Sequence, residues 1–474
     1  MRRTRHAILI LAHEDMFALK QLVAYFCKDC DIYIHIDKKS IISRSVLSEL
    51  TNMNGVRYVD QKYKINWGSY NMLLAELHLL SIAYAEQRAA YYHLFSGQDY
   101  PLRPLWYFLD FFKNGKGINY IDCRLAESKY IYDRLLQYHL YGWFNAKRNK
   151  GKNIIEKTVR LQRHFGVFRS VKHIPRIIAV GSQWFSITNE TVSAILNASK
   201  DEKNFLERLK YTFAPEELYI NTLVAKNIMD KHICFDNLRY IRWKYENGNC
   251  PSILDISHLK YCISSKALFA RKFDAKYSSE LKMFIDANII NAPFPTIFNK
   301  RNFNHYEKFF NYDFGIAQTI KTLVTELEIK DVLYVECGSC LYLDSFIGLK
   351  MPVQGISSYE ISDNYASAYN LLDFYQHIDI KDKTEANDTF DLILFINGSI
   401  YKGLYNNDVT IQNIQKLAKK YVLIIEDKEN VEDINVLNSF VGAIVCCGFR
   451  YNKLSKTIFG ANLNSKVISF FLEK

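Results

Sequence analysis

The chain has 474 residues, more than a single hydrophobic core usually holds, so we expect two domains. Hydrophobic residues make up 49% and charged residues 23%, which is the composition of an ordinary globular protein rather than of a disordered chain. The net charge of +11 points to anionic partners, and the 15% of aromatic residues suits a large core as well as ring-lined clefts for sugars or bases.

The first residues are basic, as in an export signal, but the apolar run of residues 7–12 is too short for one. No apolar run approaches the ~18 to 20 residues of a membrane span. We therefore expect a cytoplasmic protein with reduced thiols. The spacings Cys27-Lys-Asp-Cys30 and Cys337-Gly-Ser-Cys340 are those of metal knuckles, but they lie far apart in the sequence, so we expect no metal site.

Residues 1–120 alternate β-rich runs with helical patterns. We expect strands over residues 7–12, 31–36, 56–59 and 91–95, and helices over residues 16–26 and 72–85. This alternation predicts a mostly parallel α/β sheet with helices on its faces. Ligands gather at the carboxyl ends of such strands, where this chain presents His13, Asp37 and the turn of residues 96–99.

A second alternation begins after the prolines of Ala292-Pro293-Phe-Pro295. We expect helices over residues 316–327 and 362–372, and strands over residues 332–335, 353–356, 391–395 and 421–425. The second half is therefore predicted to be another open α/β sheet. The expected organisation is a first domain over residues 1–288, a linker over residues 289–305 and a second domain over residues 306–474.

Positive charge is concentrated in residues 145–176, where ten Lys or Arg residues face a single acid, for a segment charge of +9. Within it Ile154, Thr158, Leu161 and Phe165 fall near one face of a helix. Two interpretations stay open. The segment is either a basic amphipathic helix that meets an anionic membrane or lipid-linked acceptor, at the inner face of the membrane, or a solvated insertion.

Two short motifs carry the chemistry of a transfer reaction. Phe213-Ala-Pro-Glu216-Glu217-Leu-Tyr offers carboxylates at a helix start, and Ala267-Leu-Phe-Ala-Arg271-Lys272 offers two adjacent cations. A carboxylate can deprotonate a hydroxyl while cations neutralise a departing diphosphate. Together the motifs indicate a sugar transferase.

Eight segments extend this pattern along the chain. They are Ile8-Leu-Ile-Leu-Ala-His13, Tyr33-Ile-His-Ile-Asp37-Lys38, Trp67-Gly-Ser69, Leu94-Phe-Ser-Gly-Gln-Asp99-Tyr-Pro101, Gly181-Ser-Gln-Trp184-Phe185, Pro215-Glu-Glu217, Leu238-Arg239-Tyr-Ile-Arg-Trp243 and Phe269-Ala-Arg271-Lys272-Phe273. In this order they resemble the core-2/I-branching β-1,6-N-acetylglucosaminyltransferases and peptide xylosyltransferases, glycosyltransferase family 14. Each segment alone is a weak signal, but eight in family order are a strong one.

The resemblance implies a GT-A-like fold and inverting transfer from a UDP-sugar, N-acetylglucosamine or xylose, to a glycan or lipid-linked acceptor, as in bacterial polysaccharide synthesis. It also implies that no metal or other cofactor is required. The sequence agrees on this point, because Asp29-Cys-Asp31 precedes its strand instead of following it, so protein cations must neutralise the leaving diphosphate.

Carried over position by position, the resemblance makes Glu217 the catalytic base, although the family usually has Pro-Asp-Glu where this chain has Pro-Glu-Glu. Arg271 and Lys272 are the expected cations for the diphosphate, and Arg239 is a third candidate. Glu216 is expected to bind substrate or to interact with the dipole of a helix that begins near Leu218.

Four more positions are assigned to binding. His13 and Asp37, at strand ends, are expected near the donor nucleotide. Asp99 is assigned to substrate binding, with a turn-forming role as the alternative. Trp184 is expected to place its ring face against a sugar, and a core position is the alternative.

Glu336-Cys-Gly338-Ser-Cys340 follows the strand expected at residues 332–335 and is similar to the Glu-x-Gly-x-Gly loop of class I methyltransferases. Only one glycine is kept, and Ser357 stands where that family usually has an acid for ribose hydroxyls, whereas Asp379 and Phe390-Asp-Leu-Ile393 match later parts of its pattern. The resemblance implies a Rossmann-like second domain with S-adenosylmethionine as its cofactor, and a degenerate domain for assembly or acceptor binding is the alternative.

The sequence leaves two other functions to consider. One is an S-adenosylmethionine-dependent methyltransferase whose first domain recognises a glycan. The other is a nucleic-acid binder, suggested by charge and aromatic content, but the sequence has no helix-turn-helix, zinc-finger or ribonucleoprotein motif. We therefore expect no nucleic-acid partner.

Overall fold

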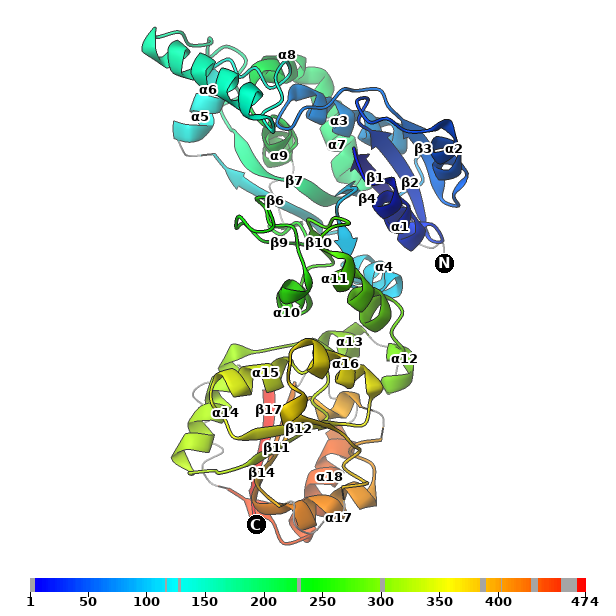
Figure 1. Ribbon diagram of the computed structural model, residues 1–474, viewed down its shortest axis with the longest axis vertical. Helices are drawn as coiled ribbons and strands as arrows, with labels where there is room; N and C mark the ends of the chain where they lie inside the picture. The colour runs from blue at the N-terminus through cyan, green and yellow to red at the C-terminus, as the bar shows by residue number, and fades with distance from the viewer. Residues whose placement is uncertain are drawn as a thin grey trace. The chain divides into compact units, whose positions relative to one another are not determined.

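The computed structural model describes residues 5–115, 117–126, 129–227, 232–298, 303–383, 389–401, 403–427, 434–452 and 467–474. The chain forms two compact units, Met1–Asp255 with Lys266–Glu280, and Ile256–Ser265 with Leu281–Lys474. Each unit contains a seven-stranded sheet and helices, so both are α/β, as expected (Figure 1).

The large sheet of the first unit has the strand order β3-β2-β1-β4-β7-β6-β8. Its strands are β1 (His6–Ala12), β2 (Cys30–Ile36), β3 (Val56–Asp60), β4 (Tyr91–Ser96), β6 (Asn119–Leu125), β7 (Ala179–Thr188) and β8 (Ile233–Cys234). The sheet is parallel from β3 to β4, and β7 runs antiparallel to both of its neighbours. The four strands expected in residues 1–120 are confirmed.

The first unit also contains α-helices. They are α1 (Met16–Phe26), α2 (Arg44–Asn52), α3 (Tyr70–Ala85), α4 (Leu105–Asn114), α5 (Lys129–Leu136), α6 (Asn149–His164), α7 (Asn189–Asp201), α8 (Lys203–Arg208) and α9 (Glu216–Asn227). Every residue of β1 and β2 is buried, which explains why these strands read as continuous apolar runs. Leu9 of β1, Leu79 of α3 and Leu218 of α9 meet in one core cluster.

A small sheet of order β5-β10-β9 completes the first unit. Its strands are β5 (Tyr100–Pro101), β9 (Arg239–Ile241) and β10 (Phe269–Arg271). β10 runs antiparallel to β5 and parallel to β9. Because β5 directly follows Asp99, this pairing brings Asp99, Arg239 and Arg271 together from three distant parts of the sequence.

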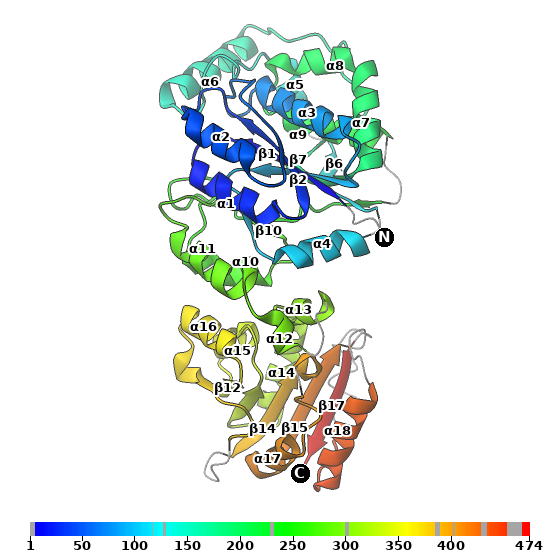
Figure 2. The ribbon, with the colours of Figure 1, turned by 90° about the vertical axis from the view of Figure 1, so that its right-hand side faces the viewer.

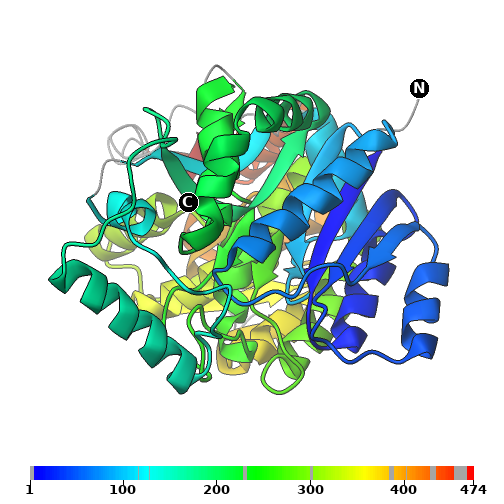
Figure 3. The same ribbon diagram turned by 90° about the horizontal axis from the view of Figure 1, so that it is seen from above.

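The basic segment forms α6, so the expected helix is present. Figure 3 shows α6, in teal, at the periphery of the first unit. In the part of the chain that the structure describes, no helix has both the length and the apolar composition needed to cross a membrane.

The second unit is an open sheet of order β13-β12-β11-β14-β15-β17-β16. Its strands are β11 (Val332–Val335), β12 (Val353–Ser357), β13 (Tyr375–His377), β14 (Phe390–Ile396), β15 (Ala418–Asp427), β16 (Arg450–Tyr451) and β17 (Val467–Glu473). Strands β13 to β15 are parallel, and β17 is antiparallel to β15 and β16. From β11 the chain continues to β12 and β13 on one side of the sheet, and then returns to form β14 and β15 on the other side. In open α/β sheets, ligands bind in the crevice where the strand order reverses in this way, which here lies between β11 and β14.

The helices of the second unit are α10 (Leu259–Ser264), α12 (Phe294–Ile297), α13 (Phe303–Phe309), α14 (Phe314–Glu326), α15 (Leu341–Gly348), α16 (Glu360–Ala368), α17 (Asp408–Leu417) and α18 (Ile434–Cys446), and α11 (Ser279–Ile285) begins in the first unit. Figure 2 shows α17 and α18 beside β14, β15 and β17. The helix expected over residues 362–372 ends at Ala368, because Asn370 adopts a left-handed conformation with a φ of 57°.

Residues 289–305, expected as a linker, contribute to the second unit. They contain the end of a π-helix (Asp286–Ile290), α12 and the start of α13, and residues 299–302 lie outside the described residues. The compact units divide between Glu280 and Leu281. Functional domain limits at 288 and 306 stay a prediction.

Candidate functional site

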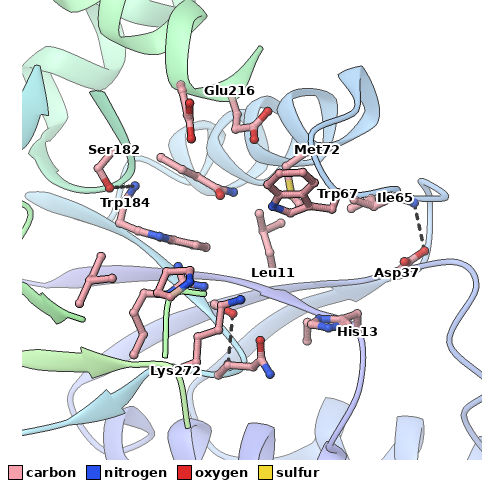
Figure 4. Close-up of a pocket in the computed structure, with 18 of the residues that line it drawn as sticks. Leu11, His13, Asp37, Ile65, Trp67, Met72, Ser182, Trp184, Glu216 and Lys272 are labelled. Carbon is pink, nitrogen blue, oxygen red and sulfur yellow. Dashed lines mark hydrogen bonds between the residues drawn. The ribbon is translucent and has the colours of Figure 1, made fainter. Parts of the chain in front are cut away.

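A cleft of about 1370 Å³ opens in the first unit, at the carboxyl ends of β1, β2 and β4 (Figure 4). This is the edge of the sheet at which the strand order predicts ligands. Its volume exceeds the ~300 to 1000 Å³ of a typical small-molecule pocket. Seven of the nine residues predicted for the site line it: His13, Asp37, Trp184, Glu216, Glu217, Arg271 and Lys272.

Glu216 and Glu217 are the first two residues of α9, so the helix begins two residues earlier than expected. The approach to α9 is fixed by Gly68, whose φ is 70° and whose added Cβ would lie 2.7 Å from the ring of Phe213. Only glycine permits this close contact and this backbone conformation. The backbone N–H of Ala214 then donates to the carbonyl of Gly68 at 2.9 Å, which ties the helix start to the Trp67-Gly-Ser loop.

Arg134, to which the sequence analysis gave no role, holds the same helix start. Its Nη2 donates to Oε2 of Glu217 at 3.2 Å and to the carbonyl of Ala214 at 2.8 Å, and it also donates to the carbonyl of Phe213 at 2.7 Å. The Arg134 side chain is 6% exposed and that of Glu217 is 39% exposed. The guanidinium therefore lies in the wall, and the carboxylate of Glu217 lies at the open side of the pair.

The two glutamates differ in their tendency to hold a proton. Burial, and secondly the charge of the neighbouring Glu217, raise the pKa of Glu216 to about 8. Burial also raises the pKa of Glu217, but the guanidinium of Arg134 opposes this rise. At neutral pH Glu216 is therefore mostly protonated, and Glu217 is the carboxylate placed to accept a proton.

A third acid stands behind them. Glu76 of α3 is buried, and burial together with the charge of Glu216 raises its pKa well above the usual value. Nε2 of Gln183 donates to Oε1 of Glu76 at 2.5 Å. Because an uncharged acid costs less to bury than a carboxylate, burial favours the protonated form of Glu76.

Arg271 and Lys272 both line the cleft although they are adjacent in sequence. Strand β10 ends at Arg271, so Lys272 lies outside the strand and the alternation of side chains does not apply to it. Nζ of Lys272 donates to Oδ1 of Asn249 at 3.4 Å. Burial and the charges of Arg271 and Lys147 lower the pKa of Lys272 to about 8.

Trp184 lines the cleft but does not present a free ring. The guanidinium carbon of Arg271 lies 4.0 Å from the centre of its ring, which is a cation–π contact. One face of the indole is thus covered by Arg271. This contact holds Arg271 in place, and stacking of the indole on a sugar stays a prediction.

Asp99 and Arg239 lie behind the wall of the cleft and do not line it. Both side chains are 0% exposed, with Nε of Arg239 3.9 Å from Asp99 Oδ2 and Nε of Arg271 3.6 Å from Asp99 Oδ1. Burial raises the pKa of Asp99, and the two guanidiniums oppose the rise. Nη2 of Arg239 donates to the carbonyl of Leu94 at 2.7 Å. Their position suits holding Arg271 in place rather than contacting a ligand.

Asp37 and His13 follow β2 and β1, as expected, and both line the cleft. Oδ1 of Asp37 accepts from the backbone N–H groups of Lys39 at 3.0 Å and Ile65 at 3.1 Å, and Oδ2 lies 3.4 Å from Nζ of Lys39. Burial lowers the pKa of His13, with the charge of Lys147 as a second cause, so its imidazole is neutral at pH 7.

Further cleft residues were missed as site residues. Lys147 lines the cleft, although the sequence pattern identified it only as a member of the basic segment. Trp67 and Trp243, which are 49% and 74% exposed, line it with more accessible rings than Trp184. Both tryptophans belong to family segments, which was the available signal. Among the described residues, no group of three or more His, Cys, Asp or Glu side chains is arranged to hold a metal ion.

In the second unit, Glu336 follows β11 and is buried, and burial raises its pKa to about 7. The hydroxyls of Ser357 and Ser358 donate to its carboxylate oxygens at 2.8 Å and 2.7 Å. Ser357 stands where a ribose-binding acid is expected, but its hydroxyl already donates a hydrogen bond to Glu336.

The crevice beside Glu336 does not fit S-adenosylmethionine. Gly338 has a φ of 56°, and a Cβ added there would lie 2.4 Å from the hydroxyl oxygen of Tyr401, so Tyr401 fills the space in front of the glycine. The ring of Tyr359 stacks on Tyr401 with centres 5.6 Å apart. The cavity that the described residues leave beside Gly338 and Asn397 measures about 10 Å³, the space of about one water molecule.

Comparisons with known proteins agree with the segments in the sequence. The Core-2/I-Branching enzyme family matches residues 7–270, more than half of the chain. A search of curated proteins found no match.

Solved structures similar to about a third of the chain are methyltransferases. A TehB-like SAM-dependent methyltransferase from Corynebacterium glutamicum is 14% identical, with 35% of this chain and 89% of that chain covered and a TM-score of 0.28. The methyltransferase NodS from Bradyrhizobium japonicum, solved with S-adenosylhomocysteine, is 11% identical, with 36% and 96% covered and a TM-score of 0.26. The plantazolicin methyltransferase BpumL, also solved with SAH, is 13% identical, with 34% and 83% covered and a TM-score of 0.25.

Proposed function

Because the chain belongs to the core-2/I-branching enzyme family of glycosyltransferases, we propose that its first unit moves a sugar from a UDP-sugar to a hydroxyl group with inversion at the anomeric carbon. The donor is UDP-N-acetylglucosamine or UDP-xylose. The acceptor is a glycan or lipid-linked glycan of bacterial surface polysaccharide or glycan synthesis, reached from the cytoplasm at the inner face of the membrane.

The observation that carries this proposal is the distribution of charge in one cleft. Glu216, at the start of α9, lies on one side, and Lys272 lies on the other (Figure 4). Glu217, the next residue of α9, also lines the cleft. A single displacement requires a base on the acceptor side of the sugar and positive charge on the leaving-group side.

In the proposed step, Glu217 accepts the proton of the acceptor hydroxyl. At the same time, the oxygen of that hydroxyl forms a bond to the anomeric carbon. The bond from that carbon to the diphosphate oxygen breaks, and its electron pair leaves with UDP. Arg271 and Lys272 neutralise the charge that develops on the diphosphate. Trp184 and Asp99 keep the guanidinium of Arg271 oriented toward the cleft.

Other residues of the cleft are assigned to binding. Protonated Glu216 donates a hydrogen bond to a sugar hydroxyl, since its buried Oε2 has no hydrogen-bond partner among the described residues. Neutral His13 and the fixed carboxylate of Asp37 lie at the strand ends proposed for the nucleotide. Trp67 and Trp243 offer ring faces for the apolar faces of a sugar or base.

The proposal includes independence from divalent metals, supported by two cations already in the cleft. Activity that disappears in chelator and returns with manganese would contradict this part. The competing function, methyl transfer from S-adenosylmethionine, has no comparable support, because Tyr401 fills the crevice in which the cofactor would bind.

A panel of UDP-sugars tests the proposal by release of UDP in the presence of glycan acceptors. We expect one donor, with N-acetylglucosamine or xylose, to be preferred by at least about tenfold, as expected for a hydrogen-bonded sugar pocket. Glu217→Gln should lower the rate of transfer from that donor by about two to four orders of magnitude, and Glu216→Gln is the matched control. Equal, negligible release with every donor would argue against the proposed activity.

A further inference from the structure

A surface that mixes apolar and basic side chains covers α6 and the residues after it. We call it the basic–apolar surface and define it as the exposed side chains of residues 143–177. Its large apolar members are Trp143, Leu161, Phe165, Val167, Phe168, Val171 and Ile177. Phe165 and Val171 are each 71% exposed, so this is not a fringe of half-buried core residues.

The cations of the same segment are exposed beside them. Of the ten Lys and Arg residues counted in the sequence, all except Arg169 are exposed: Lys147, Arg148, Lys150, Lys152, Lys157, Arg160, Arg163, Lys172 and Arg176. Only Lys152 and Arg163 have an acidic partner within 4 Å among the described residues, Glu156 at 3.9 Å and Asp133 at 3.6 Å. Most of the positive charge is therefore available to an anionic surface.

The segment is a built part of the first unit and not a loose insertion. Ile155 is 3% exposed, and a Cβ at Gly151 would lie 2.3 Å from the carbonyl of Asn145, so α6 has a closely packed inner face. Arg169 is buried, with its guanidinium over the ring of Tyr138 at 5.3 Å and bonded to Oγ1 of Thr212 at 3.3 Å. The exposed apolar side chains are thus additional to those that the fold needs.

We propose that the basic–apolar surface docks the protein on an anionic lipid bilayer. Aromatic and aliphatic side chains enter the headgroup region, and the surrounding cations contact anionic headgroups. The charge of the surface is complementary to such a membrane. A nucleic acid would meet the same cations, but it offers no apolar phase for the side chains of Leu161, Val171 and Ile177.

The surface is continuous with the cleft, because Asn145, Lys147 and Arg148 line it. Docking therefore places the cleft opening at the membrane, where an acceptor on a lipid anchor would reach Glu217. This consequence for the acceptor rests on the proposed function. The binding to lipid does not, and it is measured without any sugar.

Vesicle flotation of the full chain tests the docking. Vesicles of phosphatidylcholine alone are compared with vesicles containing about 30% phosphatidylglycerol, at low and high salt. We expect at least tenfold tighter binding to the anionic vesicles and loss of most of this preference at high salt. Equal binding to both vesicles, or none, would overturn the proposal.

Two sets of variants locate the surface. Neutralising Lys150, Lys157, Arg160 and Lys172 to Gln should weaken binding at least tenfold, whereas neutralising the exposed Lys28, Lys113, Lys203 and Lys416 should leave it nearly unchanged. Phe165→Ser with Phe168→Ser and Val171→Ser should also weaken it, in contrast to Met283→Ser with Phe314→Ser and Val409→Ser. Circular dichroism checks that each variant is folded.

The variants that lose vesicle binding show whether the basic–apolar surface, or only the net charge of the protein, binds the membrane. If both control sets weaken binding as much as their partners, the attraction is a property of net charge and the proposal fails. If RNA or DNA binds more tightly than anionic vesicles and the serine variant does not weaken that binding, the surface is a nucleic-acid site instead. UDP binding should stay the same in all of these variants, because none of the changed residues lines the cleft.

Discussion

Nη2 of Arg134 lies 3.2 Å from Oε2 of Glu217, in an ion pair whose guanidinium is buried in the wall and whose carboxylate is partly open. The same guanidinium also binds the carbonyls of Phe213 and Ala214, which precede α9. Arg134 therefore sets both the position and the basicity of Glu217. It is a positioning residue whose effect on the proposed reaction can be separated from that of the base itself.

Replacing Glu217 by Gln should lower the rate of sugar transfer by about two to four orders of magnitude, the usual contribution of a positioned general base. UDP binding, measured by calorimetry, should remain close to that of the unchanged protein because the diphosphate cations are intact. Glu216→Gln keeps the hydrogen-bonding capacity of a protonated acid and should cost far less. Near-normal turnover of the Glu217 variant would remove this residue from the mechanism.

Replacing Arg134 by Gln should shift the pH dependence of turnover. Arg134 lowers the pKa of Glu217, so its removal raises that pKa, and a higher pH is needed to ionise the base. The acid limb of the kcat profile should therefore move to higher pH, with a smaller loss of rate at pH 9 than at pH 6.

A loss of rate that is the same at every pH would mean that Arg134 acts only by holding the backbone before α9. Arg134→Lys provides the comparison, because it retains the positive charge but cannot make the same set of hydrogen bonds. We expect its acid limb to stay closer to that of the unchanged protein.

Affinity for UDP should depend on pH through Lys272. Its pKa is lowered to about 8, so the ammonium is charged below pH 8 and is lost as the pH rises through that value. The Kd for UDP should accordingly rise by up to about tenfold per pH unit above pH 8. Below pH 7 this dependence should vanish.

Lys272→Arg is the matched control, since a guanidinium stays charged over this range. Its Kd for UDP should be nearly constant between pH 7.5 and about pH 9.5. Lys272→Gln should bind UDP weakly and with little dependence on pH. A Lys272→Arg variant that keeps the full pH dependence would place the titrating group elsewhere in the cleft.

Much of the fold was predictable because local patterns decide it. The buried runs that form β1, β2 and β4, and the helical period of α1, agree with the structure to within one or two residues at each end. The presence of Glu217 and Arg271 at the site followed from the order of the segments, since no local pattern brings together residues so far apart in sequence.

The features that the sequence did not predict depend on contacts between distant parts of the chain. Arg134 lies in α5, 83 positions before Glu217, and its segment carries no distinctive pattern. The pairing of β9 with β10 places the side chain of Arg239 beside Asp99, so Arg239 does not line the cleft as predicted. Likewise, Gly338 indicates that a ligand can approach the backbone, but only the structure shows that Tyr401 occupies that place.

The filled crevice of the second unit predicts that S-adenosylhomocysteine does not bind. A ligand present at 100 times its Kd would stabilise the folded protein by about 2.7 kcal/mol, enough to raise the midpoint of thermal unfolding by several degrees. We expect no shift at millimolar S-adenosylhomocysteine and no heat in calorimetry. Tyr401→Phe should behave in the same way, because the ring still fills most of the space. Tyr401→Gly removes the ring in front of Gly338. Weak binding of S-adenosylhomocysteine that appears only in this variant would identify Tyr401 as the obstruction. Micromolar binding by the unchanged protein would instead show that Tyr401 moves aside.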